Sequence, residues 1–104
     1  MLCVTTPDIP NQAIKEVLGT VTGNVVQSKH VGRDIMAGFK TIFGGEIRGY
    51  TEMLSEAREK ALGRAVAEAE AMGADAIVNM RFTTSAIMQG ASEILVYGTA
   101  VKLR

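Results

Sequence analysis

The chain has 104 residues, which suits one domain and is too short for two separate hydrophobic cores. Its 11 basic residues balance 11 acidic ones, so the excess positive charge typical of proteins that bind nucleic acids or acidic membranes is absent. A hydrophobic fraction of 47% argues against a disordered chain, and no apolar stretch approaches the roughly 18 residues that a transmembrane helix needs.

The opening stretch, MLCVTTPDIP, lacks a basic segment, a long apolar run and a small-residue cleavage site. It therefore predicts no secretory signal, and we expect a cytoplasmic protein. Cys3 is the only cysteine, so it cannot form a disulfide within the chain. CxxC and HExxH patterns are absent, and no metal-site motif is predicted.

The N-terminal part predicts two strands. Residues 2–5 favour a short strand that pairs at a sheet edge, and the prolines that follow predict a turn over 8–11. The stretch 13–28 has some helical spacing, but its valines and threonines favour a long strand, bent at Gly19 or Gly23.

Two helices are predicted next. Apolar residues recur at helical spacing over 33–43, which predicts a short amphipathic helix that stops at Gly44. The stretch 46–72 predicts a long helix, which Gly73 ends in the position favoured for a left-handed cap.

Two β-rich segments, 76–87 and 93–103, flank Gln89 and Gly90 and predict an antiparallel hairpin. If the turn has two residues, we expect one face of the hairpin to pack against the long helix, with Val78, Met80 and Phe82 buried. That face would carry Ala76, Val78, Met80, Phe82, Tyr97, Thr99, Val101 and Leu103, and the opposite face Ile77, Asn79, Arg81, Thr83, Gly98 and Ala100. A one-residue change in turn length would rearrange these pairs.

The apolar side of the long helix is wide. It covers about half of the circumference, which is more than one small sheet needs, so this helix could also contact another chain. Its centre and borders are formed by Ile47, Tyr50, Leu54, Ala57, Ala61, Leu62, Ala65, Val66, Ala69 and Met72. The four alanines at four-residue spacing either allow another backbone to approach closely or simply favour helix formation.

Arg58 projects into this apolar side. A buried guanidinium needs a carboxylate or carbonyl partner, and Asp34, Glu46 and Asp75 are the acidic candidates. Alternatively, Arg58 extends its aliphatic stem over the edge of the apolar side and keeps its charge in water.

The sequence resembles the YbjQ family of small prokaryotic proteins over essentially its whole length. The segments that carry the resemblance are RDIMAG at 33–38, GGE at 44–46 with Tyr50, Leu54, Ala57, Arg58 and Ala61, GADAIV at 73–78, and GTAV at 98–101. The resemblance implies an α+β fold, a two-layer dodecin-like β-α-β-β core with the long helix on an antiparallel sheet. It also implies a homopentameric ring, in which the short N-terminal strand and the short helix assist assembly.

The family carries a heavy-metal-binding label, which the residues support weakly. Soft ions prefer clustered thiolate, thioether or imidazole ligands, whereas this chain offers one cysteine, His30 and six scattered methionines. A structural role for Cys3 and His30 is the simpler interpretation, and no metal ligand or cofactor is assigned.

Three functional hypotheses follow. The first is a non-enzymatic oligomeric module that binds a small ligand or ion. Its candidate binding residues are Arg33, Asp34, Glu46 and Tyr50 around the Gly44-Gly45 loop, together with Arg58. The second is a scaffold or protein-interaction assembly, built on the short amphipathic helix. The third is an enzyme that uses His30 or Asp34 as a base, although no nucleophile or phosphate-binding motif accompanies them.

Overall fold

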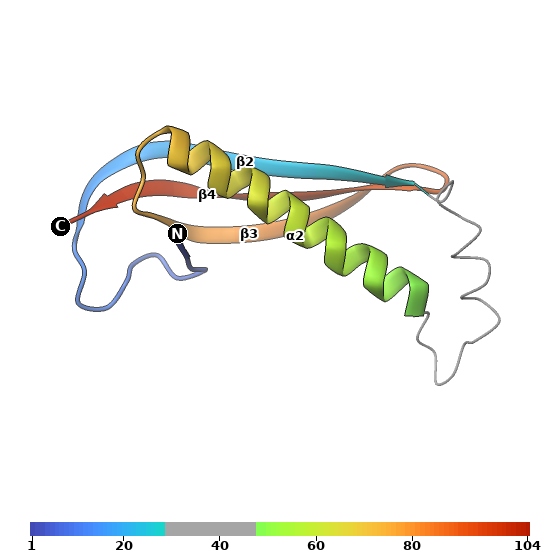
Figure 1. Ribbon diagram of the computed structural model, residues 1–104, viewed down its shortest axis with the longest axis horizontal. Coiled ribbons are helices and arrows are strands. Elements are labelled where there is room, and N and C mark those ends of the chain that lie inside the picture. The colour runs from blue at the N-terminus through green and yellow to red at the C-terminus, as the bar shows by residue number, and fades with distance from the viewer. Residues whose placement is uncertain (29–47) are drawn as a thin grey trace.

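The computed structural model of the chain describes residues 1–28 and 48–104 and has an α+β fold (Figure 1). One helix packs on a four-stranded sheet with the strand order β1-β3-β4-β2. The elements are β1 (Leu2–Cys3), β2 (Ile14–Ser28), α2 (Arg48–Ala71), β3 (Ala76–Met88) and β4 (Ala91–Leu103). The helix predicted over 33–43 lies outside the described residues.

The sheet is mixed rather than purely antiparallel. The strands β3 and β4 form the predicted hairpin with Gln89 and Gly90 as the two-residue turn, and β2 pairs antiparallel with β4. The short strand β1 lies parallel to β3 at the edge, which confirms the edge strand expected from the sequence. The predicted turn near residues 8–11 is also present, because Ile9 and Gln12 form an isolated bridge.

The long strand β2 is confirmed over the ambiguous stretch. Its register against β4 shifts between Val17 and Gly19, and Gly19 has a φ of 140°, so the predicted irregularity is at this glycine. Beyond it the strand alternates regularly, with Val21, Gly23 and Val25 buried and their neighbours exposed. One face of β2 therefore meets the core.

The helix α2 ends as predicted. Gly73 follows it with a φ of 77°, and the N–H of Ala74 donates to the carbonyl of Ala69 at 3.0 Å. This hydrogen bond and the left-handed Gly73 close the C-terminal end of the helix and turn the chain toward β3.

The four alanines of α2 pack against the sheet. Ala57, Ala61, Ala65 and Ala69 are at most 1% exposed, and α2 lies mainly over β2 and β4. At the closest point a Cβ placed on Gly23 would lie 2.0 Å from the carbonyl oxygen of Ala61. The small side chains thus allow a close backbone approach, and the partner is strand β2 of the same chain.

The prediction of which sheet face meets the helix is wrong. The core beneath α2 contains Ile77, Ile94, Val96 and Ala100, which the sequence had placed on the opposite face or left unassigned. A bulge between Val78 and Arg81 explains part of the error, because one extra residue changes which side chains share a face. Met80, within the bulge, is buried against this core as expected.

Phe82 is not buried, contrary to prediction. It pairs with Val96 in the register, so it lies on the helix side of the sheet, yet it is 42% exposed. The reason is that α2 crosses β2 and β4 and has few contacts with β3. Figure 1 shows α2 diverging from the strands toward its N-terminal end, which leaves the outer part of β3 uncovered.

The N-terminal segment covers the other face at one end of the sheet. Ile9 packs there with Ala76, Val78 and Val101 in a second hydrophobic cluster. Backbone hydrogen bonds extend the edge pairing past β1: Val4 and Thr6 bond to Ile77, Asn79 and Met80. Val78 is therefore buried as predicted, but beneath the N-terminal segment instead of the helix.

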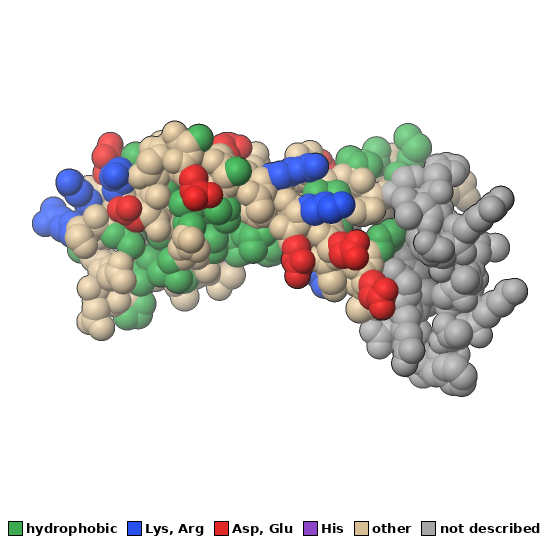
Figure 2. All heavy atoms as spheres, viewed as in Figure 1, with side chains coloured by type: hydrophobic (Ala, Val, Ile, Leu, Met, Phe, Trp, Pro, Cys, Tyr) green, Lys and Arg blue, Asp and Glu red, His purple; other side chains and the backbone are tan. Residues whose placement is uncertain are grey.

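Arg58 is exposed, which agrees with the alternative in which its charge stays in water, and it forms no buried ion pair with a described residue. Its guanidinium donates to the hydroxyl of Ser55 at 3.3 Å, one turn earlier in α2. Asp75, one of the three proposed partners, instead accepts a hydrogen bond from the N–H of Leu103 at 2.9 Å. In Figure 2 charged side chains lie over the outward side of α2, and hydrophobic side chains gather between this helix and the sheet.

Candidate functional site

The charged site predicted from the sequence is only partly visible. Arg33, Asp34 and Glu46 lie outside the described residues, as does His30, and the side chain of Tyr50 is not described. Arg58, the remaining candidate, points to water beside Ser55. The described part of the chain therefore brings no two of these candidates together.

Within residues 1–28 and 48–104, no group of three or more His, Cys, Asp and Glu side chains is arranged to hold a metal ion. Cys3 is a free, partly buried thiol, and burial raises its pKa above the ordinary value. Since a metal needs the thiolate, this environment opposes ligation at Cys3. The residues described do not fit a heavy-metal site.

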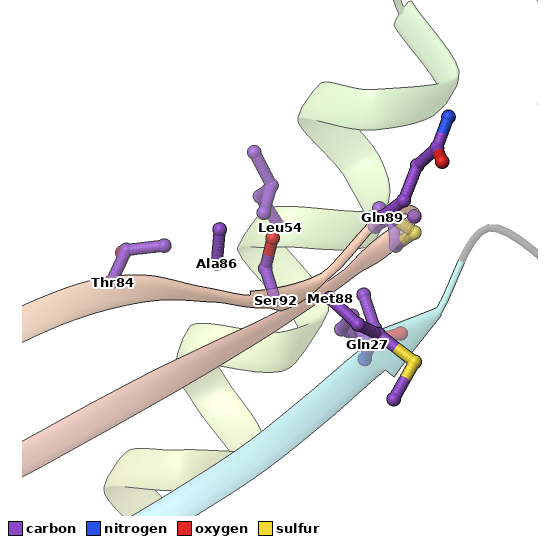
Figure 3. A pocket seen from close by; sticks show the side chains of 10 residues that line it. Gln27, Leu54, Thr84, Ala86, Met88, Gln89 and Ser92 are labelled. Carbon is purple, nitrogen blue, oxygen red and sulfur yellow. The ribbon is translucent and has the colours of Figure 1, made fainter.

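A pocket lies where α2 diverges from the hairpin. Its volume is about 460 Å³, and its walls come from the end of β2, the first half of α2 and the tip of the β3–β4 hairpin (Figure 3). The lining residues are Gln27, Met53, Leu54, Thr84, Ala86, Met88, Gln89, Gly90, Ala91 and Ser92. The volume falls in the range typical of small-molecule sites.

The described residues that line this pocket are all uncharged, since none of the ten is acidic or basic. Met53, Leu54 and Met88 supply apolar surface, while two glutamine amides and two hydroxyls supply hydrogen-bonding groups. Such a site can hold an uncharged molecule but offers no counterion to a charged one.

Sequence reasoning missed this pocket. The sequence predicts only a turn at Gln89 and Gly90, and it assigns no role to Met53 or Met88. The available signal was Met88, an apolar residue directly before the turn, where a solvated hairpin tip would favour polar residues. The divergence of α2 from β3 that opens the pocket has no sequence signature.

The outer part of β3 is exposed on its edge and on its faces. No described strand pairs with β3 on the side opposite β4 beyond Met80. Phe82, Ile87 and Met88 are 42%, 50% and 66% exposed, respectively. The edge of β2 differs, because Arg64 of α2 donates a hydrogen bond to the backbone carbonyl of Asn24 and so occupies part of that edge.

Comparison with known proteins shows the family of the chain. A model of the YbjQ family, with the description "Putative heavy-metal-binding", matches residues 1–104. The chain belongs to the YbjQ family. Its relatives include a UPF0145 protein of Photobacterium profundum, 82% identical over 103 residues that cover 99% of this chain and 100% of the relative.

Other members of the YbjQ family are similarly complete matches. A UPF0145 protein of Colwellia psychrerythraea is 66% identical over 104 residues, covering 100% of this chain and 99% of the relative. One from Thermotoga maritima is 61% identical over 103 residues, covering 99% and 97%.

A solved structure supports the fold. A DUF74-family protein of unknown function from Pediococcus pentosaceus superimposes with a TM-score of 0.68 at 14% identity, covering 100% of this chain and 98% of the other. At this identity the similarity shows a shared fold only. The described helix α2 lacks the apolar length needed to cross a membrane.

Proposed function

We propose that this YbjQ-family protein is a non-enzymatic homo-oligomeric module that binds a small ligand. The pocket between α2 and the hairpin carries the proposal, because it combines an apolar wall with several uncharged polar groups in one concave site. In this proposal the chain is a single domain over residues 1–104 and acts in the cytoplasm.

Assembly is supported by the outer part of β3. Exposed strand edges and exposed large apolar side chains are normally covered, and here both occur together at Phe82 and Ile87. A neighbouring copy of the chain would cover them. The number five and a dodecin-like ring come from the resemblance described above, and the predicted helix over 33–43 would contribute to the same contacts.

The proposed ligand contacts are those of the pocket. Arg33, Asp34, Glu46, Tyr50 and Arg58, the candidates from the sequence, remain proposals for a second set of contacts near the start of α2. A bound metal ion is the less favoured ligand, because the described residues provide no ligand cluster for it.

Assembly is tested by native mass spectrometry at micromolar concentration. We expect several copies for the native protein and a lower mass for Phe82→Asp, because a carboxylate cannot be buried at the contact without a partner. Ala67→Asp, on an exposed position of α2, introduces the same charge and should keep the native mass. A monomeric native protein would contradict the proposal.

Ligand binding is tested by thermal unfolding with a panel of metal ions, nucleotides, phosphates and neutral compounds. A ligand that binds only the folded state raises the melting temperature, by an amount that grows with the ratio of its concentration to its dissociation constant. A panel without any shift would remove the ligand-binding part of the proposal.

A scaffold or protein-interaction role is the second candidate. The exposed hydrophobic side chains at the hairpin tip favour it, because the same surface would suit a protein partner. Native mass spectrometry separates the two: a scaffold retains protein partners and shows no added small-molecule mass.

A further inference from the structure

We propose that the pocket between α2 and the hairpin binds an uncharged, largely apolar small molecule that carries at least one hydrogen-bonding group. This inference rests on the proposed ligand-binding function and names the ligand class. It concerns the pocket of a single chain, so it does not require the oligomer.

The lack of charge among the described residues of the wall disfavours ionic ligands. A charged ligand in the pocket would lose part of its water and find no opposite charge among the ten described lining residues. A neutral ligand loses much less hydration when it enters. The wall therefore discriminates against anions such as nucleotides and phosphates.

The apolar wall determines the body of the ligand. Met53 and Leu54 line the pocket from α2, and Met88 lines it from the hairpin, so the two elements present apolar surface to the same space. Met88 is 66% exposed, and a ligand that packs against it removes this surface from water. Methionine side chains are flexible, which lets the wall adapt to a planar or a chain-like molecule.

The polar groups determine the rest of the ligand. In Figure 3 Thr84 and Ser92 lie on neighbouring strands, with Gln27 and Gln89 at the end of the sheet near the turn. No hydrogen bond to another described residue engages the side chains of these four residues. Amides and hydroxyls both donate and accept, so they match a neutral hydroxyl, carbonyl or amide on the ligand.

Two probes with the same aromatic framework test the charge selectivity. N-phenyl-1-naphthylamine is neutral, and 8-anilinonaphthalene-1-sulfonate carries a sulfonate. We expect saturable fluorescence enhancement with the neutral probe and at least tenfold weaker binding of the anionic one. Equal affinities for the two probes, or no saturable binding of the neutral probe, would overturn the inference.

Two variants locate the bound probe. Ala86 lines the pocket, so Ala86→Trp should fill it and weaken binding of the neutral probe at least tenfold. Thr83 is exposed on the face of β3 opposite to Ala86, so Thr83→Trp is the matched control. Its affinity for the neutral probe should stay within twofold of the native value. Excitation beyond the tryptophan absorption band avoids interference from the new side chain. Native affinity in Ala86→Trp would place the probe elsewhere and overturn the inference.

Native mass spectrometry of the same samples distinguishes a failure of the ligand-class inference from a failure of the assembly proposal. If the protein is monomeric and binding still depends on Ala86, the assembly proposal fails and the ligand class stands. If a charged compound raises the melting temperature and Ala86→Trp abolishes that shift, the ligand-binding function stands and the ligand class fails.

Discussion

The backbone of Gly23 in β2 lies directly against Ala61 in α2. A Cβ on Gly23 would lie 2.0 Å from the Ala61 carbonyl oxygen and 2.6 Å from the Ala65 nitrogen. Both obstacles are backbone atoms, which cannot rotate away as a side chain can. The helix can approach β2 this closely only because both sides of the contact are small.

Gly23→Ala should therefore lower the free energy of unfolding by about 3 kcal/mol, the upper part of the range for overpacked cores. Urea unfolding measures this loss. Gly63→Ala in α2 is the matched control, because a Cβ at Gly63 would meet no atom within 4 Å. Replacing a helical glycine there should stabilise the protein by roughly 0.5–1 kcal/mol. A harmless Gly23→Ala would mean that α2 does not approach β2 as described.

Ile94 and Phe82 should respond differently to truncation. Ile94 is 2% exposed beneath α2, so Ile94→Ala should cost about 2–5 kcal/mol. Phe82→Ala should cost about 1 kcal/mol in the isolated chain, because 42% of Phe82 is already exposed. Urea unfolding at several protein concentrations measures both. If a neighbouring copy covers Phe82, only the loss in Phe82→Ala grows with concentration.

Arg81 holds the N-terminal segment against β3. Its guanidinium donates to the carbonyl of Thr5 at 2.8 Å and to that of Met80 at 2.9 Å. Arg81→Met should lower the free energy of unfolding by about 1 kcal/mol, since both bonds lie near the surface. Hydrogen exchange should also become faster at the amides of Val4 and Asn79, which pair across this contact.

Arg58→Met is the control for the loss of an arginine. Arg58 is exposed and bonds only to Ser55 among the described residues, so its replacement should change stability by less than about 0.5 kcal/mol. A larger loss in Arg58→Met than in Arg81→Met would indicate an acidic partner for Arg58, the first of the two alternatives from the sequence.

Cys3 should react slowly with iodoacetamide. Burial raises the pKa of its thiol, and the nearby N-terminal ammonium offsets only part of this effect. The thiolate is the nucleophile, so at pH 8 the folded protein should be alkylated several-fold more slowly than the same chain in urea. Mass spectrometry follows the reaction. Equal rates in the folded and unfolded chain would contradict the prediction.

The same pKa shift predicts a pH dependence of stability. The thiol loses its proton at a lower pH in the unfolded chain than in the folded one. The free energy of unfolding should therefore decrease as the pH rises above the ordinary pKa of a cysteine thiol, and Cys3 should contribute no change well below it. Cys3→Ser provides the comparison, because its stability should lack this component.

Arg58 shows why the helix was predicted better than its packing. A single helical projection places Arg58 among the apolar residues, but residues four apart differ by about 40° in direction. From Ala57 to Ala69 the buried line therefore turns around α2, and only Ala57 and Ala61 define the buried direction near Arg58. The projection compared Arg58 with the buried direction at Ala65 and Ala69, which lie further along α2 and face a different way from the helix surface at Arg58.

Local chemistry in the sequence by itself determined the helix of 48–71 with its glycine stop, the strand of 14–28, the hairpin with its two-residue turn, and the short edge strand. These depend on side-chain period, turn residues and backbone preferences between near neighbours. The resemblance likewise determined the family.

The tertiary structure alone decided which sheet face meets α2, whether Phe82 is covered, and where the pocket lies. Side chains alternate along a strand, so the bulge near Asn79 changes the face of each residue that follows it. The path of α2 across β2 and β4 depends on the contact of Gly23 with Ala61, two residues 38 positions apart in sequence, and only folding brings that pair together.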